Sequence, residues 1–145
     1  MIQENQGCYR KIRPVDISGI LRLLPEVKFE DTGGPNGWIA RPAWMAGFIE
    51  SLNPEGRVTF TLLRKLPPFQ NLPPHVDSYN NVPNIGKRFH VPLLTHPEVV
   101  MRWPNDDVEV HLEAGWLWEV CYTKLHEVAH RASVDRVHLH FNVVR

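Results

Sequence analysis

Cysteine is scarce in this chain of 145 residues, and the formal net charge is zero. Only Cys8 and Cys121 are present, far apart in the sequence, which argues against a disulfide framework and favours a reducing, cytoplasmic location. Sixteen basic and sixteen acidic side chains cancel, so nothing in the composition indicates a nucleic-acid or anionic-membrane partner. No apolar stretch approaches the length of a membrane span, and the polar first residues predict no signal peptide.

The sequence also lacks internal repeats and low-complexity tracts, and its length suits one domain, residues 1–145, with a single core. Residues 1–56 are expected to form an N-terminal segment with two helices. In Val15–Leu24, apolar side chains recur at helical spacing, with Asp16 placed to cap the start and Pro25 to stop it. A second helix is predicted over Ala43–Leu52, and both are expected to pack on one sheet.

From residue 57 onward the sequence predicts strands. Apolar and polar side chains alternate over short segments, and Gly, Pro and Asn mark turns between them. Many short strands of this kind predict a mainly β fold, a sandwich or double-sheet jelly roll, over residues 57–145. The expected strands are Val58–Leu62, Arg88–Leu94, Val99–Trp103, Val108–Leu112, Trp116–Val120 and Arg136–Val143.

Three side chains with nitrogen and oxygen donors form a candidate metal site: His75, Asp77 and His126. The proline-rich run 67–74 disfavours helix, and we expect the His-x-Asp pair to begin a strand, where residues two apart project to one side. Two imidazoles and one carboxylate on one face of an ion leave the opposite face open, the arrangement of non-haem Fe(II) oxygenases. His-x-Asp alone is a weak signal in a chain with eight histidines, and a surface turn with a solvated carboxylate is its other interpretation.

The segment Arg136–Val143 has two chemically different faces, because side chains alternate along a strand. Arg136, His138, His140 and Asn142 share one face, and apolar residues share the other. A buried arginine needs an anionic partner, and a dicarboxylate would supply one in bidentate geometry. We therefore expect Arg136 to point inward, while a solvated outer face remains the alternative.

The order of these elements resembles the aspartyl/asparaginyl β-hydroxylase family of 2-oxoglutarate oxygenases. His75, Arg88-x-His90, His126 and Arg136 follow one another as in that family, and the resemblance spans about residues 57–144. It implies a cupin-like double-stranded β-helix with Fe(II) and 2-oxoglutarate as cofactors. The implied reaction uses dioxygen to hydroxylate an unactivated carbon of an amino acid, a peptide residue of the Asp or Asn type, or another small molecule.

The resemblance also implies roles for single residues. His75 and His126 would bind iron. Some members of the family lack an acidic ligand, so Asp77 as the third ligand is inferred from the His-x-Asp pattern instead.

The cosubstrate would be held by cations and polar side chains. Arg136 would pair with the distal carboxylate of 2-oxoglutarate, with Thr61 assisting, and Arg88 and His90 would lie near its other carboxylate. Four further residues are candidate substrate contacts: His138, Trp38, Arg41 and Trp103.

Two other functions stay open. Residues His126 to His130 spell H-E-x-x-H, which on a helix would bind zinc in a metalloprotease with Glu127 as the general base. The extended form of that motif would need Gly at Ser133 and His at Arg136, and neither is present. The second alternative is a jelly-roll module that binds a metal or another ligand without turnover. Only the oxygenase predicts that 2-oxoglutarate is consumed.

Overall fold

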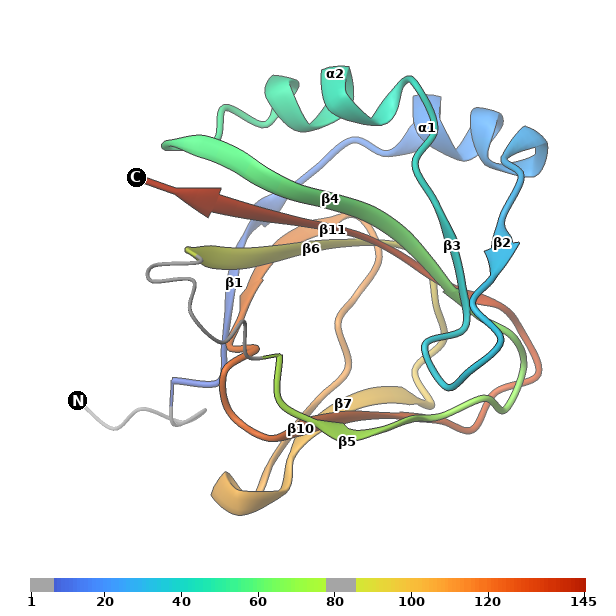
Figure 1. Cartoon of the computed structure of the whole chain (residues 1–145), viewed down its shortest axis with the longest axis vertical. Coiled ribbons are helices and arrows are strands. Elements are labelled where there is room, and N and C mark those ends of the chain that lie inside the picture. The colour runs from blue at the N-terminus through green and yellow to red at the C-terminus, as the bar shows by residue number, and fades with distance from the viewer. Residues whose placement is uncertain (1–6, 78–85) are drawn as a thin grey trace.

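The computed structural model describes residues 7–77 and 86–145, which form two facing antiparallel sheets with two short α-helices on the outer side of the larger sheet (Figure 1). The larger sheet has the strand order β1-β9-β6-β11-β4-β3-β2, and the smaller has the order β5-β10-β7-β8. Among these residues, no helix is long and apolar enough to cross a membrane. The elements are β1 (Tyr9–Pro14), α1 (Ser18–Leu23), the 3-10 turn Leu24–Glu26, β2 (Glu30–Asp31), β3 (Trp38–Ala40), α2 (Met45–Ser51), β4 (Arg57–Leu66), β5 (Leu72–His75), β6 (Lys87–Leu94), β7 (Val99–Trp103), the 3-10 turn Pro104–Asp106, β8 (Val108–Val110), β9 (Trp116–Val120), β10 (His126–His130) and β11 (Arg136–Val144).

Strand β11 lies in the middle of the larger sheet, between β4 and β6, and its two faces differ as predicted. Val137, Leu139 and Phe141 belong to the main apolar core, together with Met45 and Ile49 of α2. The alternate residues of β11 point toward the smaller sheet because side chains change face at every residue. The polar face of β11 is therefore enclosed between the two sheets.

The helices begin and end close to the predicted positions. The N-cap of α1 is Ile17 and not Asp16 as predicted, although Oδ1 of Asp16 accepts hydrogen bonds from the backbone N–H and the hydroxyl of Ser18, at 3.0 and 2.7 Å. Pro25 ends the α-helix as predicted, but the chain continues into a 3-10 turn there. The first 56 residues also supply β1, β2 and β3, which the sequence pattern did not indicate, and β1 and β2 form the two edges of the larger sheet.

The proline-rich approach to His75 differs from the prediction. We expected the His-x-Asp pair to begin a strand, whereas His75 ends β5, which contains Pro73 and Pro74. Among the described strands, β5 lies at the edge of its sheet and pairs only with β10, so the missing proline N–H groups leave few ladder bonds unmade. Strand β5 thus places His75 directly beside β10.

Candidate metal centre

Paired strands bring the three predicted metal ligands together. His75 and His126 are Cα partners across β5 and β10, and their ring centroids lie 4.3 Å apart. The backbone N–H of Asp77 donates to the carbonyl oxygen of Tyr122 at 3.0 Å, which fixes the chain just beyond β5. The carboxylate of Asp77 then lies 3.6 Å from Nε2 of His75 and 3.5 Å from Nε2 of His126. Donor atoms of the three side chains all lie within 4.8 Å of one another.

Backbone carbonyls orient both imidazoles of this group. Nδ1 of His75 lies 2.7 Å from the carbonyl oxygen of Pro73, and Nδ1 of His126 lies 2.7 Å from that of Lys124. A carbonyl oxygen only accepts, so each Nδ1 carries a proton, and Nε2 is the ring atom of each histidine that can bind a metal. Metal-bound histidines are typically held in this way. Two Nε2 atoms and a carboxylate therefore form a donor set that fits Fe(II).

Asp77 is held in its charged form. Burial favours the neutral acid, but the contact with His126 and the positive charge of Arg88 outweigh it and lower the pKa of this carboxyl below its ordinary value. Nη1 of Arg88 donates to Oδ2 of Asp77 at 2.8 Å, and Nε donates to Oδ1 of Asn142 at 2.9 Å. Nη2 of Arg88 is buried and has no hydrogen-bond partner among the described residues. Arg88 thus contacts the candidate ligand Asp77 and also lines the cavity in which the cosubstrate is predicted to bind.

A cavity of about 320 Å³ lies between the two sheets and has the three candidate ligands in its wall. Among the described residues that line it, four arginines accompany one carboxylate, that of Asp77. The arginines are Arg41, Arg64, Arg88 and Arg136. This excess of positive charge favours an anionic occupant.

Arg136 is the group in the cavity wall that most favours a bound anion. Its side chain points inward as predicted and is 2% exposed, and its Nε and Nη1 atoms have no partner among the described residues. Burial, and then the charge of Arg64, lower the pKa of Arg136 to about 9, so the guanidinium stays charged at neutral pH. A buried charge without a counterion is costly, and a bound carboxylate would remove much of that cost.

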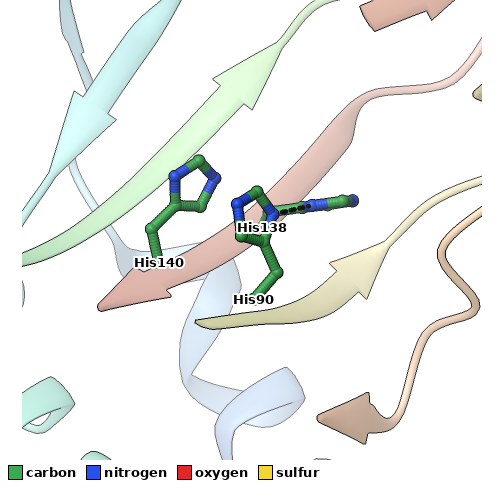
Figure 2. A group of neighbouring side chains, drawn as sticks. All are labelled: His90, His138 and His140. Atoms are coloured by element: carbon green, nitrogen blue, oxygen red, sulfur yellow. Dashed lines mark hydrogen bonds between the residues drawn. The ribbon is translucent and has the colours of Figure 1, made fainter. Parts of the chain in front are cut away.

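Three further histidines are buried beside the cavity (Figure 2). His90 comes from β6, while His138 and His140 come from β11. The rings of His90 and His140 stack with centroids 3.9 Å apart, and Nδ1 of His90 lies 3.1 Å from Nδ1 of His138. Burial, followed by neighbouring groups that include Arg136, lowers the pKa of all three histidines well below the ordinary value. At neutral pH these rings are therefore uncharged.

The structure corrects the prediction for Thr61. This residue is the Cα partner of Phe141, whose side chain packs in the core with the helices. Its neighbours Phe60 and Leu62 line the cavity, so Thr61 faces the opposite side of β4. The side chain of Thr61 therefore does not point into the cavity, and its backbone oxygen accepts a hydrogen bond from Nε of Arg41, a cavity residue, at 3.0 Å.

Two of the four predicted substrate contacts lie elsewhere as well. Trp103 is fully buried in a core cluster, and its indole N–H donates to the carbonyl oxygen of Cys121 at 2.9 Å. Trp38 is paired with Lys65, whose ammonium lies 5.1 Å from the indole centroid, and it faces away from the cavity. Arg41 does line the cavity, whereas His138 is not among the lining residues and is buried against His90, which does line it.

Sequence reasoning did not single out Arg64, His140 and Asn142. Arg64 lines the cavity from β4, and Nη1 donates to the carbonyl oxygen of Asn36 at 2.6 Å. Extending the alternation of β4 beyond Leu62 would have placed Arg64 on the cavity face. His140 and Asn142 share the polar face of β11 with Arg136, which was the signal for them.

The zinc-protease interpretation of residues 126–130 is wrong. These residues form strand β10 and not a helix, so His126 and His130 lie at its two ends. Four residues along a strand span about 13 Å, too far for two side chains to share one ion. The backbone N–H of His130 instead donates to Oδ1 of Asn71 at 2.8 Å.

The fold and the site together define a jelly-roll domain with a candidate metal centre between its two sheets. The profile of the family described as Aspartyl/Asparaginyl beta-hydroxylase matches residues 45–145, and the chain belongs to this family. No curated protein matches the sequence.

Solved structures with the same fold confirm the double-stranded β-helix. The viral collagen prolyl hydroxylase of Paramecium Bursaria Chlorella virus-1, determined as a 2OG complex, has a TM-score of 0.63 at 12% identity, covering 95% of this chain and 96% of that chain. A Pseudomonas putida prolyl-4-hydroxylase also has a TM-score of 0.63, at 14% identity, covering 97% of this chain and 94% of that chain. A predicted oxalate decarboxylase of Thermotoga maritima has a TM-score of 0.53 at 16% identity, covering 83% of this chain and 96% of that chain.

Proposed function

We propose that this protein is a hydroxylase that depends on Fe(II) and 2-oxoglutarate. Membership of the β-hydroxylase family and the jelly-roll fold support a hydroxylase. One observation supports the dependence on Fe(II) and 2-oxoglutarate. A single cavity is lined both by His75, Asp77 and His126 and by Arg136, which is buried and has N–H groups without a partner among the described residues. The first feature suits a divalent metal, and the second needs an organic anion.

In this proposal His75, Asp77 and His126 hold the metal. When bound, iron and 2-oxoglutarate supply the oxidising power with which dioxygen hydroxylates an unactivated carbon, while the cosubstrate is converted to succinate and carbon dioxide. The charge of Asp77 offsets part of the charge of the cation. Arg88 holds that carboxylate in place, because its Nη1 donates to Oδ2 of Asp77.

The cosubstrate is bound by the polar faces of β6 and β11. Arg136 pairs with the distal carboxylate of 2-oxoglutarate, which satisfies its free N–H groups. His90 and the free Nη2 of Arg88 lie near the other carboxylate. Apolar side chains complete the wall and reduce the access of water, namely Phe60, Leu62, Met101, Val120 and Val128.

The substrate would enter beside the two remaining arginines. Arg41 is exposed and Arg64 is partly exposed, and both line the cavity in addition to the groups assigned to iron and cosubstrate. Guanidinium groups recognise carboxylate and amide oxygens. This supports an amino acid, a peptide residue of the Asp or Asn type, or another small molecule with such an oxygen as the substrate.

The proposal can be tested by spectroscopy under anaerobic conditions. Fe(II) and 2-oxoglutarate together should produce a weak visible charge-transfer band, which His126→Ala should abolish. Arg136→Met should keep iron and lose at least about tenfold in affinity for 2-oxoglutarate, because a charge-assisted pair is removed. Arg41→Met is the matched control, since it removes a cavity guanidinium outside the proposed cosubstrate site and should leave the band unchanged.

Turnover is tested in air by succinate release across a panel of amino acids and peptides. Succinate that depends on one substrate would support the hydroxylase. A band without succinate for any candidate would favour a binding module that holds the metal without turnover. Unchanged affinity for 2-oxoglutarate in Arg136→Met would remove the role given to Arg136.

A further inference from the structure

The three buried histidines, His90, His138 and His140, could be a second metal site or a hydrogen-bonded support. Their donor atoms lie within 4.8 Å of one another, which is close enough for ligands of one ion. The charge of Arg136 acts on all three histidines and that of Arg88 acts on His90 and His140, and these guanidinium groups would repel a cation. A hydrogen-bonded support is therefore favoured.

The contact between His90 and His138 has two possible directions. Both rings are uncharged, so each carries a single N–H, and across the 3.1 Å contact between the Nδ1 atoms one ring donates and the other accepts. If His90 donates, the proton of His138 is on Nε2. If His138 donates, the proton of His90 is on Nε2. The arrangement that leaves fewer buried N–H groups of His90 and His138 without a hydrogen-bond partner is the one assigned.

The surroundings of His138 favour a proton on its Nδ1. Nε2 of His138 is buried and has no partner among the described residues, and an N–H at that atom would be an orphaned donor. Arg136 precedes it by two residues on the same face of β11, and its Nε and Nη1 donors also lack partners there. The positive charge of Arg136 acts on His138, so it stabilises a lone pair on Nε2 and disfavours an N–H at that atom.

We propose that His138 is a positioning residue whose Nδ1–H donates to Nδ1 of His90 and thereby fixes the proton of His90 on Nε2. His90 lines the cavity, and this tautomer offers its Nε2–H as a hydrogen-bond donor to the carboxylate of 2-oxoglutarate beside the metal. His140 holds the ring plane of His90 by stacking on it (Figure 2). The role for the carboxylate rests on the proposed function, while the tautomer does not.

Nitrogen NMR of the imidazoles tests the tautomer directly in the metal-free wild-type protein. His90 should be protonated only at Nε2, and His138 only at Nδ1. In His138→Leu, His90 should become a mixture of both tautomers because its partner is lost. His138→Asn is the matched variant, since the side-chain amide can still donate to Nδ1 of His90 and should preserve the wild-type tautomer.

Binding gives the second measurement. His138→Leu should weaken 2-oxoglutarate about tenfold, and His138→Asn should restore affinity to within about twofold of wild type, as expected for one hydrogen bond to a charged ligand. Fe(II) affinity should be unchanged in both variants. If His138 had a merely structural role, its loss would not weaken the binding of 2-oxoglutarate while leaving the affinity for Fe(II) unchanged.

Three outcomes would overturn the proposal. The first is wild-type His90 protonated at Nδ1, a result that holds even where a variant fails to fold. The second is a His90 tautomer that does not change in His138→Leu. The third is a second equivalent of zinc or Fe(II) that shifts the signals of the three histidines, which would make them a metal site. Failure of the wild type to bind 2-oxoglutarate would instead count against the proposed function, and the tautomer would still be decided.

Discussion

Beyond the two histidines, Asp77 is the candidate ligand on which the proposed iron site depends most clearly, because one carboxylate contacts both imidazoles and Arg88. Removal of its charge leaves the donor set with two neutral nitrogens and leaves Arg88 without its anion. Arg88 is 7% exposed, so its charge would then be largely buried and uncompensated.

We expect Asp77→Asn to lower the affinity for Fe(II) by at least about tenfold, as calorimetric titration under anaerobic conditions would show. The free energy of unfolding should fall by about 1–3 kcal/mol because the buried guanidinium loses a charged partner. Glu109→Gln serves as the control, since its carboxylate pairs with Arg102 at the surface, 55% exposed, and contacts none of the three candidate ligands. Unchanged Fe(II) affinity in Asp77→Asn would show that two histidines suffice for metal binding.

At the scale of elements, the short hairpin of β2 and β3 forms one wall of the cavity through Thr32, Asn36 and Ile39. Its turn depends on Gly37, which has φ of +72° and whose added Cβ would lie 2.4 Å from the carbonyl oxygen of Lys65 on β4. The backbone oxygen of Gly37 also accepts hydrogen bonds from the N–H and the hydroxyl of Thr32. The turn therefore needs both the left-handed backbone and the absence of a side chain.

Gly37→Ala should destabilise the protein by about 1–3 kcal/mol, the cost expected for a strained backbone position, and it should displace the hairpin from β4. Chemical denaturation measures the first effect, and weaker binding of the substrate proposed to lie beside Arg64 measures the second. Gly34→Ala in the same turn is the matched control, since an added Cβ there meets nothing within 4 Å. Equal stability of the two variants would contradict the role of Gly37.

The strands show which elements a sequence can predict. Strands β7 and β9 have the predicted bounds, and β6 and β11 differ by one residue at one end, because buried strands alternate strongly. Strand β5 was not predicted because two prolines disfavour a strand anywhere except at an edge, and the edge position depends on the tertiary structure. Strand β1 was not predicted because four of its six residues are exposed, and these four are arginine, lysine or proline.

Predictions of single site residues depended on strand register. The candidate ligands and Arg136 were identified from their order along the chain, and the structure brings them to one cavity. Thr61 was taken from the family resemblance and Trp38 was chosen by residue type, and each lies on the face of its strand that points away from that cavity. A shift of one residue in a strand reverses the face, so residue type without register could not decide them.

Over the whole molecule, the larger sheet separates two environments. The side of β11 that faces the helices is apolar, whereas the side that faces the smaller sheet holds buried polar groups from β6 and β11. Among these, His90, His138 and His140 are kept uncharged by burial first and by neighbouring groups second. This arrangement makes stability depend on pH.

The free energy of unfolding should fall as the pH is lowered from 7 to 5. The unfolded chain binds protons at histidine near its ordinary pKa of about 6.5, while the three folded histidines, whose pKa is well below that value, remain uncharged. Each such histidine contributes a slope of about 1.4 kcal/mol per pH unit below 6.5, so three contribute up to about 4 kcal/mol per unit.

Asp77 affects the free energy of unfolding in a different pH range from the three histidines. The folded pKa of Asp77 lies below the ordinary value of an aspartate, so its contribution to stability is present above that ordinary value and is lost only as the pH falls through the folded pKa. Between pH 6.5 and 5 the loss of stability therefore reports buried histidines. Urea denaturation at several pH values measures the slope, and His140→Asn should reduce it by about one third of the three-histidine total, since one proton-binding difference is removed. A stability that does not change between pH 7 and 5 would mean that these histidines take up protons in the folded protein, and the polar interior would then have to be more hydrated than its burial indicates.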